Sequence, residues 1–203
     1  MKKTLLILLC TLFLSTMNAQ NMNLPAPQKK GGKPLMEALA ERKSNRTFSG
    51  QKLTEQELSN LLWAANGINR EDGRRTAPSA RNMQQIEIYV IMPDATYLYD
   101  YKEHKLTLVK KGDFRTIATN DFAHKAPVVL LFVANYDKMK GMSDETRDLY
   151  SATDCGNVSQ NVYLYCASVG LNTVALGNID REKAKKEFGF NGKAILGQPV
   201  GRP

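Results

Sequence analysis

Hydrophobic positions recur at helical spacing between residues 55 and 66. The apolar residues of this segment, three or four apart and so on one helix face, are Leu58, Leu61, Leu62 and Ala65. Thr54 and Glu57 stand where a capping box would satisfy the first backbone N–H groups. Gly67 follows the last apolar position, as at many helix ends. The pattern predicts an amphipathic helix over 55–66.

The remaining apolar segments predict an alternation of strands and helices. Two further helices are expected, over 144–168 and from Asp180 to Phe188. The expected strands are 86–92, 97–101, 106–109, 128–134, 172–176 and 194–200, of which the second and third form a hairpin. The 128–134 run is apolar throughout, as in a strand covered on both faces. We therefore predict an α+β sandwich, a mixed sheet flanked by helices.

Residues 1–19 have the pattern of a secretory signal peptide. Lys2 and Lys3 precede an apolar run over 5–14, and Ala19 offers a small residue for cleavage. The apolar run is too short to span a bilayer. We expect export to the periplasm or the medium after cleavage near Ala19. A flexible leader is expected over 20–38 and a single domain over 39–203.

Charge and cysteine content narrow the classes of function. The chain has 203 residues and a net charge of +8, so anionic ligands are plausible. Its cations are scattered without an aromatic-basic stripe, which disfavours a nucleic-acid partner. Cys155 and Cys166 are too far apart on one predicted helix to form a disulfide. No Cys/His spacing suits a metal ion.

Familiar catalytic motifs are missing. The sequence has no GxSxG, HExxH, Walker A or GxGxxG pattern. Its histidines, His104 in a hairpin turn and His124 before a strand, are expected in surface or capping roles more than in catalysis. Two polar segments remain: ERKSNRTF at 41–48 and PSARNMQQ at 78–85. The first could hold a phosphate, contact nucleic acid or keep a turn soluble. The second is a binding loop before a buried strand or simply a polar turn.

Several short motifs follow one another in a fixed order. They are RKSNRTF at 42–48, LLWAANG at 61–67, RTAPSARNMQ at 75–84, Asp154-Cys155-Gly156, Gln160-Asn161 and GLNTVALG at 170–177. In this order they resemble the nitroreductase superfamily of flavoproteins, and within it the branch of SagB-like and thiazole/oxazole-forming dehydrogenases. The resemblance covers 39–203.

The resemblance implies FMN bound without a covalent bond at a homodimer interface, with both subunits lining each flavin. Residues matching the phosphate and ribityl contacts are Arg42, Lys43 and Ser44. Arg46 matches the cation beside the N1/C2 edge, where it would favour the negatively charged reduced flavin. Arg202 is a candidate for a further phosphate contact, because family members usually carry more cations near this end.

Two other segments match the parts of the family site around the flavin ring. The loop expected from the other subunit contains Pro78, Ser79, Ala80 and Asn82. Gln84 matches a polar side chain that flanks the ring. The backbone expected over the flavin face is that of Val174, Ala175, Leu176 and Gly177.

By this resemblance the chain is an FMN-dependent oxidoreductase with small-molecule electron donor and acceptor. The flavin N5 atom carries the hydride, so no catalytic side chain is expected. Two alternatives stay open. One is a SagB-like FMN dehydrogenase that oxidises a ring or C–N bond of its substrate. The other is a flavin-binding protein without turnover.

Overall fold

The computed structural model describes residues 19–203. The predicted signal peptide lies outside this range apart from Ala19. The strands are β1 (Met22–Asn23), β2 (Ile86–Ile91), β3 (Ala95–Asp100), β4 (Lys105–Lys111), β5 (Val128–Asn135), β6 (Asn172–Thr173) and β7 (Gly192–Gly201). The α-helices are α1 (Leu35–Glu41), α2 (Glu55–Asn66), α3 (Asp144–Val169) and α4 (Arg181–Phe188). Short 3-10 turns join several of them.

The strands form one sheet in the order β1-β4-β3-β2-β5-β7-β6. The hairpin of β3 and β4 and the central position of the apolar strand β5 agree with the sequence predictions. The predicted α+β class is therefore confirmed. Each described strand pair is antiparallel, so within residues 19–203 the sheet predicted as mixed is an antiparallel one.

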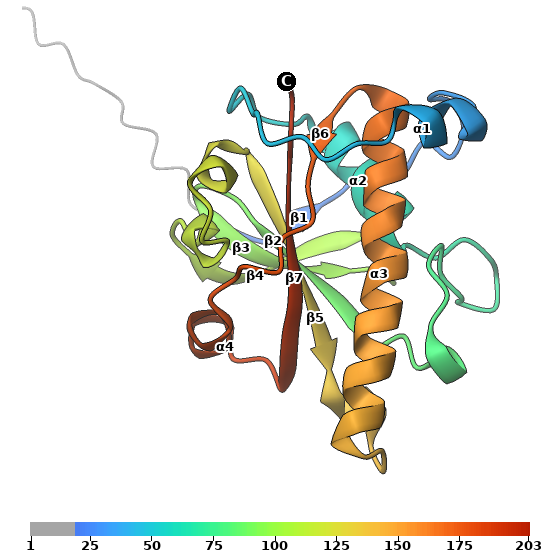
Figure 1. Cartoon of the computed structure of the whole chain (residues 1–203), viewed down its shortest axis with the longest axis vertical. Helices are drawn as coiled ribbons and strands as arrows, with labels where there is room; N and C mark the ends of the chain where they lie inside the picture. The colour runs from blue at the N-terminus through green and yellow to red at the C-terminus, as the bar shows by residue number, and fades with distance from the viewer. Residues whose placement is uncertain (1–18) are drawn as a thin grey trace, which may run out of the picture.

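Helices cover both faces of this sheet (Figure 1). Alternate β5 residues such as Leu130 and Phe132 pack in one cluster with apolar residues of α2 and α3. Their neighbours Leu131 and Val133 pack in the second cluster with Ala184 and residues around α4. The continuous apolar run of β5 is thus explained by burial on both sides.

The helix ends follow their local sequence signals. Thr54 Oγ1 accepts from Glu57 N–H at 3.2 Å, while Glu57 Oε2 accepts from Thr54 N–H at 2.8 Å. The predicted capping box is therefore present. Gly170 ends α3 with φ of 75°, in the left-handed region that glycine adopts without steric cost. The long α3 stands along one side of the sheet in Figure 1. No helix of residues 19–203 is both long and apolar enough to cross a membrane.

The prediction of a flexible leader over 20–38 is corrected. In this segment β1 pairs with β4, and Ser59 Oγ donates to Pro25 O at 2.6 Å. Lys33 N–H donates to Ser168 O at 3.1 Å, and α1 then packs against α3. The Pro, Gly and Lys content suggested a linker, but backbone groups of the segment find partners on elements distant in sequence. A pattern within the segment could not show those partners.

Candidate functional site

Two segments far apart in the sequence are joined at the C-terminal end of α3. We call residues 42–47 and 172–177 together the clamp. Asn45 N–H donates to Thr173 O at 2.9 Å, and the Asn45 side chain donates to Asn172 Oδ1 at 2.8 Å. The Asn172 side chain donates in turn to Thr47 O at 2.8 Å. These bonds hold the two segments side by side.

Tyr163 of α3 links both clamp segments. Its hydroxyl accepts from Ala175 N–H at 2.8 Å and lies 2.9 Å from Ser44 Oγ. The Arg42 guanidinium lies 5.2 Å from the centre of the Tyr163 ring, within cation–π distance. Sequence reasoning assigned no role to Tyr163. No motif could reveal it, because its partners come from positions far from it in the chain.

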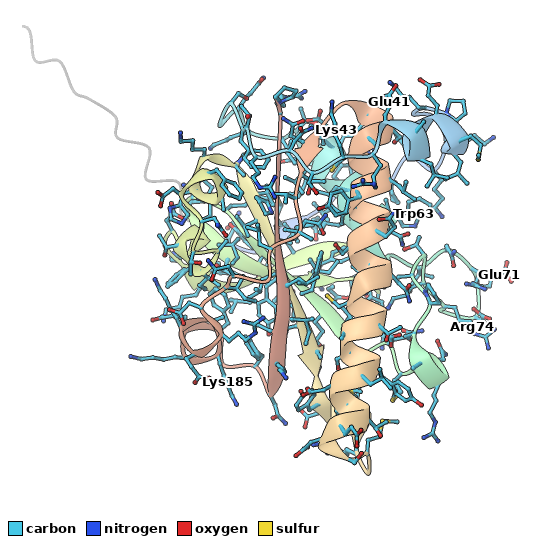
Figure 2. All side chains as sticks on the ribbon, viewed as in Figure 1. Glu41, Lys43, Trp63, Glu71, Arg74 and Lys185 are labelled. Atoms are coloured by element: carbon cyan, nitrogen blue, oxygen red, sulfur yellow. The ribbon has the colours of Figure 1, made fainter. Side chains whose placement is uncertain are left out.

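The cations of the clamp are not neutralised within the chain. Arg42, Lys43 and Arg46 form no ion pair among residues 19–203. Glu41, the one acid beside them, is 2.6 Å from Lys33. Figure 2 shows Glu41 and Lys43 close together above the end of α3. The clamp therefore presents positive charge that an anionic group can neutralise.

The 174–177 segment gives the clamp an open backbone edge. Leu176 exchanges two backbone hydrogen bonds with Gly197 of β7, at 2.7 and 2.9 Å. Gly177 is exposed, and a Cβ at this position would meet nothing within 4 Å. The predicted strand over 172–176 is corrected to Asn172–Thr173, because Ala175 N–H turns away from β7 to Tyr163.

The loop over 76–85 has an unusual backbone. Arg81, Asn82 and Gln84 have φ values of 52°, 54° and 51°, in a region disfavoured for residues with a side chain. Gln84 N–H donates to Ser79 Oγ at 3.0 Å, and the Gln84 side chain donates to Gly73 O. These bonds keep the loop compact while Arg81 and Asn82 stay exposed.

Asp154 of α3 anchors this loop. Its Oδ2 atom accepts from Ala80 N–H at 2.9 Å and from the Gln85 side chain at 2.7 Å. The Asp154 residue is only 4% exposed. The sequence comparison included Asp154 in a motif but assigned it no role. The signal in the sequence that could have revealed this role is an acidic residue on the core-facing side of a predicted helix.

The loop and the clamp lie at different places along α3. Asp154 and Asn157 contact the loop, the latter through a long 3.5 Å bond to Pro78 O. Tyr163 contacts the clamp, about 14 Å further along the axis at 1.5 Å per residue. Figure 2 shows Glu71 and Arg74 at the outer end of the preceding turn, well away from Lys43. One chain therefore does not bring Ser79, Ala80 and Asn82 to the clamp.

Arg202 is held away from other anions by Glu57. Its Nη2 atom lies 2.6 Å from Glu57 Oε1, and its carbonyl accepts from Ser49 N–H at 3.1 Å. Burial would raise the pKa of Glu57, but hydrogen bonds from Thr54 and the charge of Arg202 bring it below the ordinary value. The phosphate role of Arg202 stays a prediction, and in this chain the side chain joins the C-terminus to α2.

The two histidines have structural partners. His104 lies 2.7 Å from Ser59 Oγ and 2.8 Å from Tyr99 Oη. Ser59 is fully buried and donates to Pro25, so it offers no accessible nucleophile. His124 Nε2 contacts Ala118 O at 2.9 Å. Within 19–203 no group of three His, Cys, Asp or Glu side chains could hold a metal ion.

Comparison with known proteins identifies the family of this chain. The sequence model of the Nitroreductase family matches residues 39–202, and the chain belongs to this family of oxidoreductases. A Methanocaldococcus jannaschii protein named as a nitroreductase, MJ1384, is 32% identical over 179 residues, covering 83% of this chain and 90% of that protein. The SagB-like branch stays a prediction.

Solved structures agree with the assignment. The crystal structure of a protein from Ralstonia eutropha named as a nitroreductase has a TM-score of 0.86 at 40% identity, covering 91% of this chain and 90% of that one. A Staphylococcus epidermidis protein named as an NAD(P)H:FMN oxidoreductase has a TM-score of 0.65 at 16% identity, covering 87% and 91%. The second likeness shows the shared fold.

Proposed function

We propose that this protein is an FMN-dependent oxidoreductase that binds the FMN phosphate at the clamp. The observation that carries the proposal is the group of three cations, Arg42, Lys43 and Arg46, without an acidic partner among residues 19–203. Lys110 and Lys193, by contrast, each have a carboxylate within 2.9 Å. Exposed cations held by a fixed backbone fit a dianionic phosphate.

The shape of the clamp also fits FMN. Arg42, Lys43 and Ser44 would hold the phosphate and ribityl chain, and Arg46 would lie at the N1/C2 edge of the ring. The open backbone at Gly177 leaves room for a flat group against the clamp. When bound, FMN supplies hydride transfer at its N5 atom. The protein contributes binding, orientation and exclusion of water, which explains why no catalytic triad is needed.

A homodimer would complete the site. The stretch of α3 between loop and clamp has an exposed stripe formed by Leu149, Ala152, Thr153, Gly156 and Gln160. If a second copy of α3 packs antiparallel across this stripe, the loop end of each helix meets the clamp end of the other. Pro78, Ser79, Ala80 and Asn82 of one subunit would then reach the flavin of the other, with Gln84 beside the ring.

Exposed apolar side chains support this assembly. Leu149 is 62% exposed at the loop end of α3. Leu35 and Met36 of α1 are 62% and 76% exposed near the clamp end. In an antiparallel pair these two patches would face each other and become buried, which removes apolar surface from water.

Three candidate activities use the same flavin site and differ in their substrates. A nitroreductase-like enzyme takes electrons from a small donor and passes them to an acceptor through one pocket. A SagB-like enzyme oxidises a ring or C–N bond of its own substrate. A flavin-binding protein without turnover would use the same clamp. Nicotinamide nucleotides are cytoplasmic metabolites, so the predicted export would separate the protein from these donors.

Spectra and sedimentation test the proposal. The purified protein is expected to show FMN absorption, and anaerobic addition of NADH, NADPH or candidate substrates should bleach it. Bleaching by dithionite alone would favour the non-catalytic protein. The melting temperature should rise with FMN and with protein concentration together, because FMN binds only the assembled form. A monomer that holds FMN tightly would exclude the shared site.

A further inference from the structure

Asp154 is a buried carboxylate without a cationic partner in residues 19–203. It is 4% exposed and takes part in no ion pair there. A buried charge of this kind is costly unless hydrogen bonds satisfy it. Both hydrogen bonds that Asp154 receives come from the 76–85 loop and not from α3 or the sheet. The hydrogen bonds of Asp154 therefore stabilise the loop.

The two donors bracket the strained part of the loop. Ala80 N–H precedes Arg81 and Asn82, and the Gln85 side chain follows Gln84. The three residues in between with positive φ adopt a conformation that persists only when surrounding contacts impose it. One carboxylate oxygen bonded to both ends supplies such a contact. Charge-assisted hydrogen bonds are roughly twice as strong as neutral ones.

Gln85 connects this anchor to the sheet. Its residue is fully buried, and its carbonyl accepts from Asn135 N–H at the end of β5 at 2.9 Å. The loop is thus fixed between α3 and the sheet, while Ser79 and Ala80 are half-buried and Asn82 is exposed. These bonds hold the loop without any ligand, and a segment already held in place loses less entropy on binding.

We propose that Asp154 is a positioning residue that holds the 79–85 segment in the form that completes the FMN site of the partner subunit. Asp154 does not touch the cofactor and acts through Ala80 and Gln85. The inference rests on the proposed function. It adds that the carboxylate acts across the subunit interface, because the clamp of its own chain lies about 14 Å further along α3 at the helical rise.

A matched pair of substitutions tests the anchor. Asp154→Asn keeps the shape but removes the charge and turns one acceptor into a donor. Asp148→Asn makes the same change at an exposed position of α3 bonded to Lys193. We expect faster amide hydrogen exchange at Ala80 and about tenfold to a hundredfold weaker FMN binding in Asp154→Asn alone. Unchanged FMN affinity, or unchanged exchange at Ala80, would overturn the inference.

The proposed function has its own control in the same experiment. If the wild-type protein binds no FMN, the proposed function is wrong. This inference is then wrong as well, whatever the exchange data show. If the wild-type and Asp154→Asn proteins bind FMN equally well, only the proposed role of Asp154 is wrong.

Mixed dimers separate positioning from general damage. One chain carries Asp154→Asn, with an intact clamp, and the other carries Arg42→Ala, with an intact loop. If Asp154 acts on the partner, the mixed dimer regains one FMN site of wild-type affinity. If Asp154 acts within its own subunit, or merely weakens the fold, no such site forms. Distinct affinity tags allow the mixed species to be isolated and titrated with FMN, and the absence of the restored site would refute the inference.

Discussion

The clamp and the 76–85 loop, which contact α3 at different positions, differ in how their charged groups are satisfied. At the clamp end, Arg42, Lys43 and Arg46 lie at the surface without acidic partners among residues 19–203. At the loop, Asp154 is buried and accepts hydrogen bonds from Ala80 N–H and from the Gln85 side chain. The difference shows that the cations of the clamp have no acidic partner within residues 19–203, while the Asp154 carboxylate is satisfied by hydrogen bonds from the strained loop.

The same contrast separates the parts that need a partner from those that do not. The two segments of the clamp are joined by hydrogen bonds, but its cations have no acidic partner within residues 19–203. The loop is held by hydrogen bonds within the chain but lies too far from the clamp of its own chain. A second subunit and an anionic cofactor would resolve both features at once. Each prediction below changes one side of this contrast.

The largest effect is expected where the two ends would meet across an interface. Gly156 is exposed on α3 between Asp154 and Tyr163, and a Cβ there meets nothing within 4 Å. Gly156→Arg should leave the single chain folded but place a charge in the closed interface, at a cost of at least about 3 kcal/mol. We expect a monomer that loses FMN, measured by sedimentation and flavin titration.

A control on another surface makes this result specific. Glu182→Arg changes the charge of exposed α4, which lies on the other face of the sheet. It should leave assembly and FMN binding unchanged. A Gly156→Arg protein that remains a dimer with full FMN content would place the interface elsewhere.

The next effect concerns the clamp alone. Arg42→Ala removes one charge-assisted contact to the phosphate, a loss of about 1.5–3 kcal/mol or roughly tenfold to a hundredfold in affinity. The fold should persist, since Arg42 forms no ion pair in the described chain. Lys110→Ala, at an exposed cation paired with Glu187, is the matched control. Equal FMN retention in both proteins at high dilution would make Arg42 an ordinary surface cation.

Arg46 should affect the redox potential more than binding. A cation at the N1/C2 edge favours reduced flavin, and each kcal/mol of this preference corresponds to about 20 mV for two electrons. Arg46→Gln keeps hydrogen-bonding capacity and removes the charge. We expect FMN still bound, with a midpoint more negative by a few tens of millivolts at this conversion. Spectroelectrochemical titration of both loaded proteins measures it, and an unchanged midpoint removes Arg46 from the mechanism.

The smallest effect tests a region outside both ends of α3. Burial lowers the pKa of His104 below its ordinary value of 6.5. The unfolded chain therefore binds this proton more readily, and His104 makes stability fall as pH drops below about 6.5. His104→Gln should weaken that dependence, seen as a smaller loss of melting temperature between neutral and mildly acidic pH. FMN affinity should be unaffected, because His104 contacts Ser59 and Tyr99.

Local sequence patterns predicted the structure correctly where it depends on residues close together in the chain. The capping box at Thr54 and Glu57 and the left-handed Gly170 depend on hydrogen bonds and sterics within a few residues. The burial of β5 followed from its composition, since a continuous apolar strand is stable only when both faces are covered. The motif order then gave the family, which the match over 39–202 confirms.

Only the tertiary structure decided which distant groups meet. Three contacts each join positions more than 100 residues apart. They are the Asn45–Thr173 bond, the Ser44–Tyr163 contact and the Glu57–Arg202 pair. Likewise, the segment over 20–38 is docked because its backbone finds partners on α2, α3 and β4. The sequence by itself determined the main helices and strands from residue 55 onward and the candidate residues, but not β1 and α1. The separation of loop and clamp along α3, which makes a second subunit necessary to the proposed site, follows from packing that no local pattern encodes.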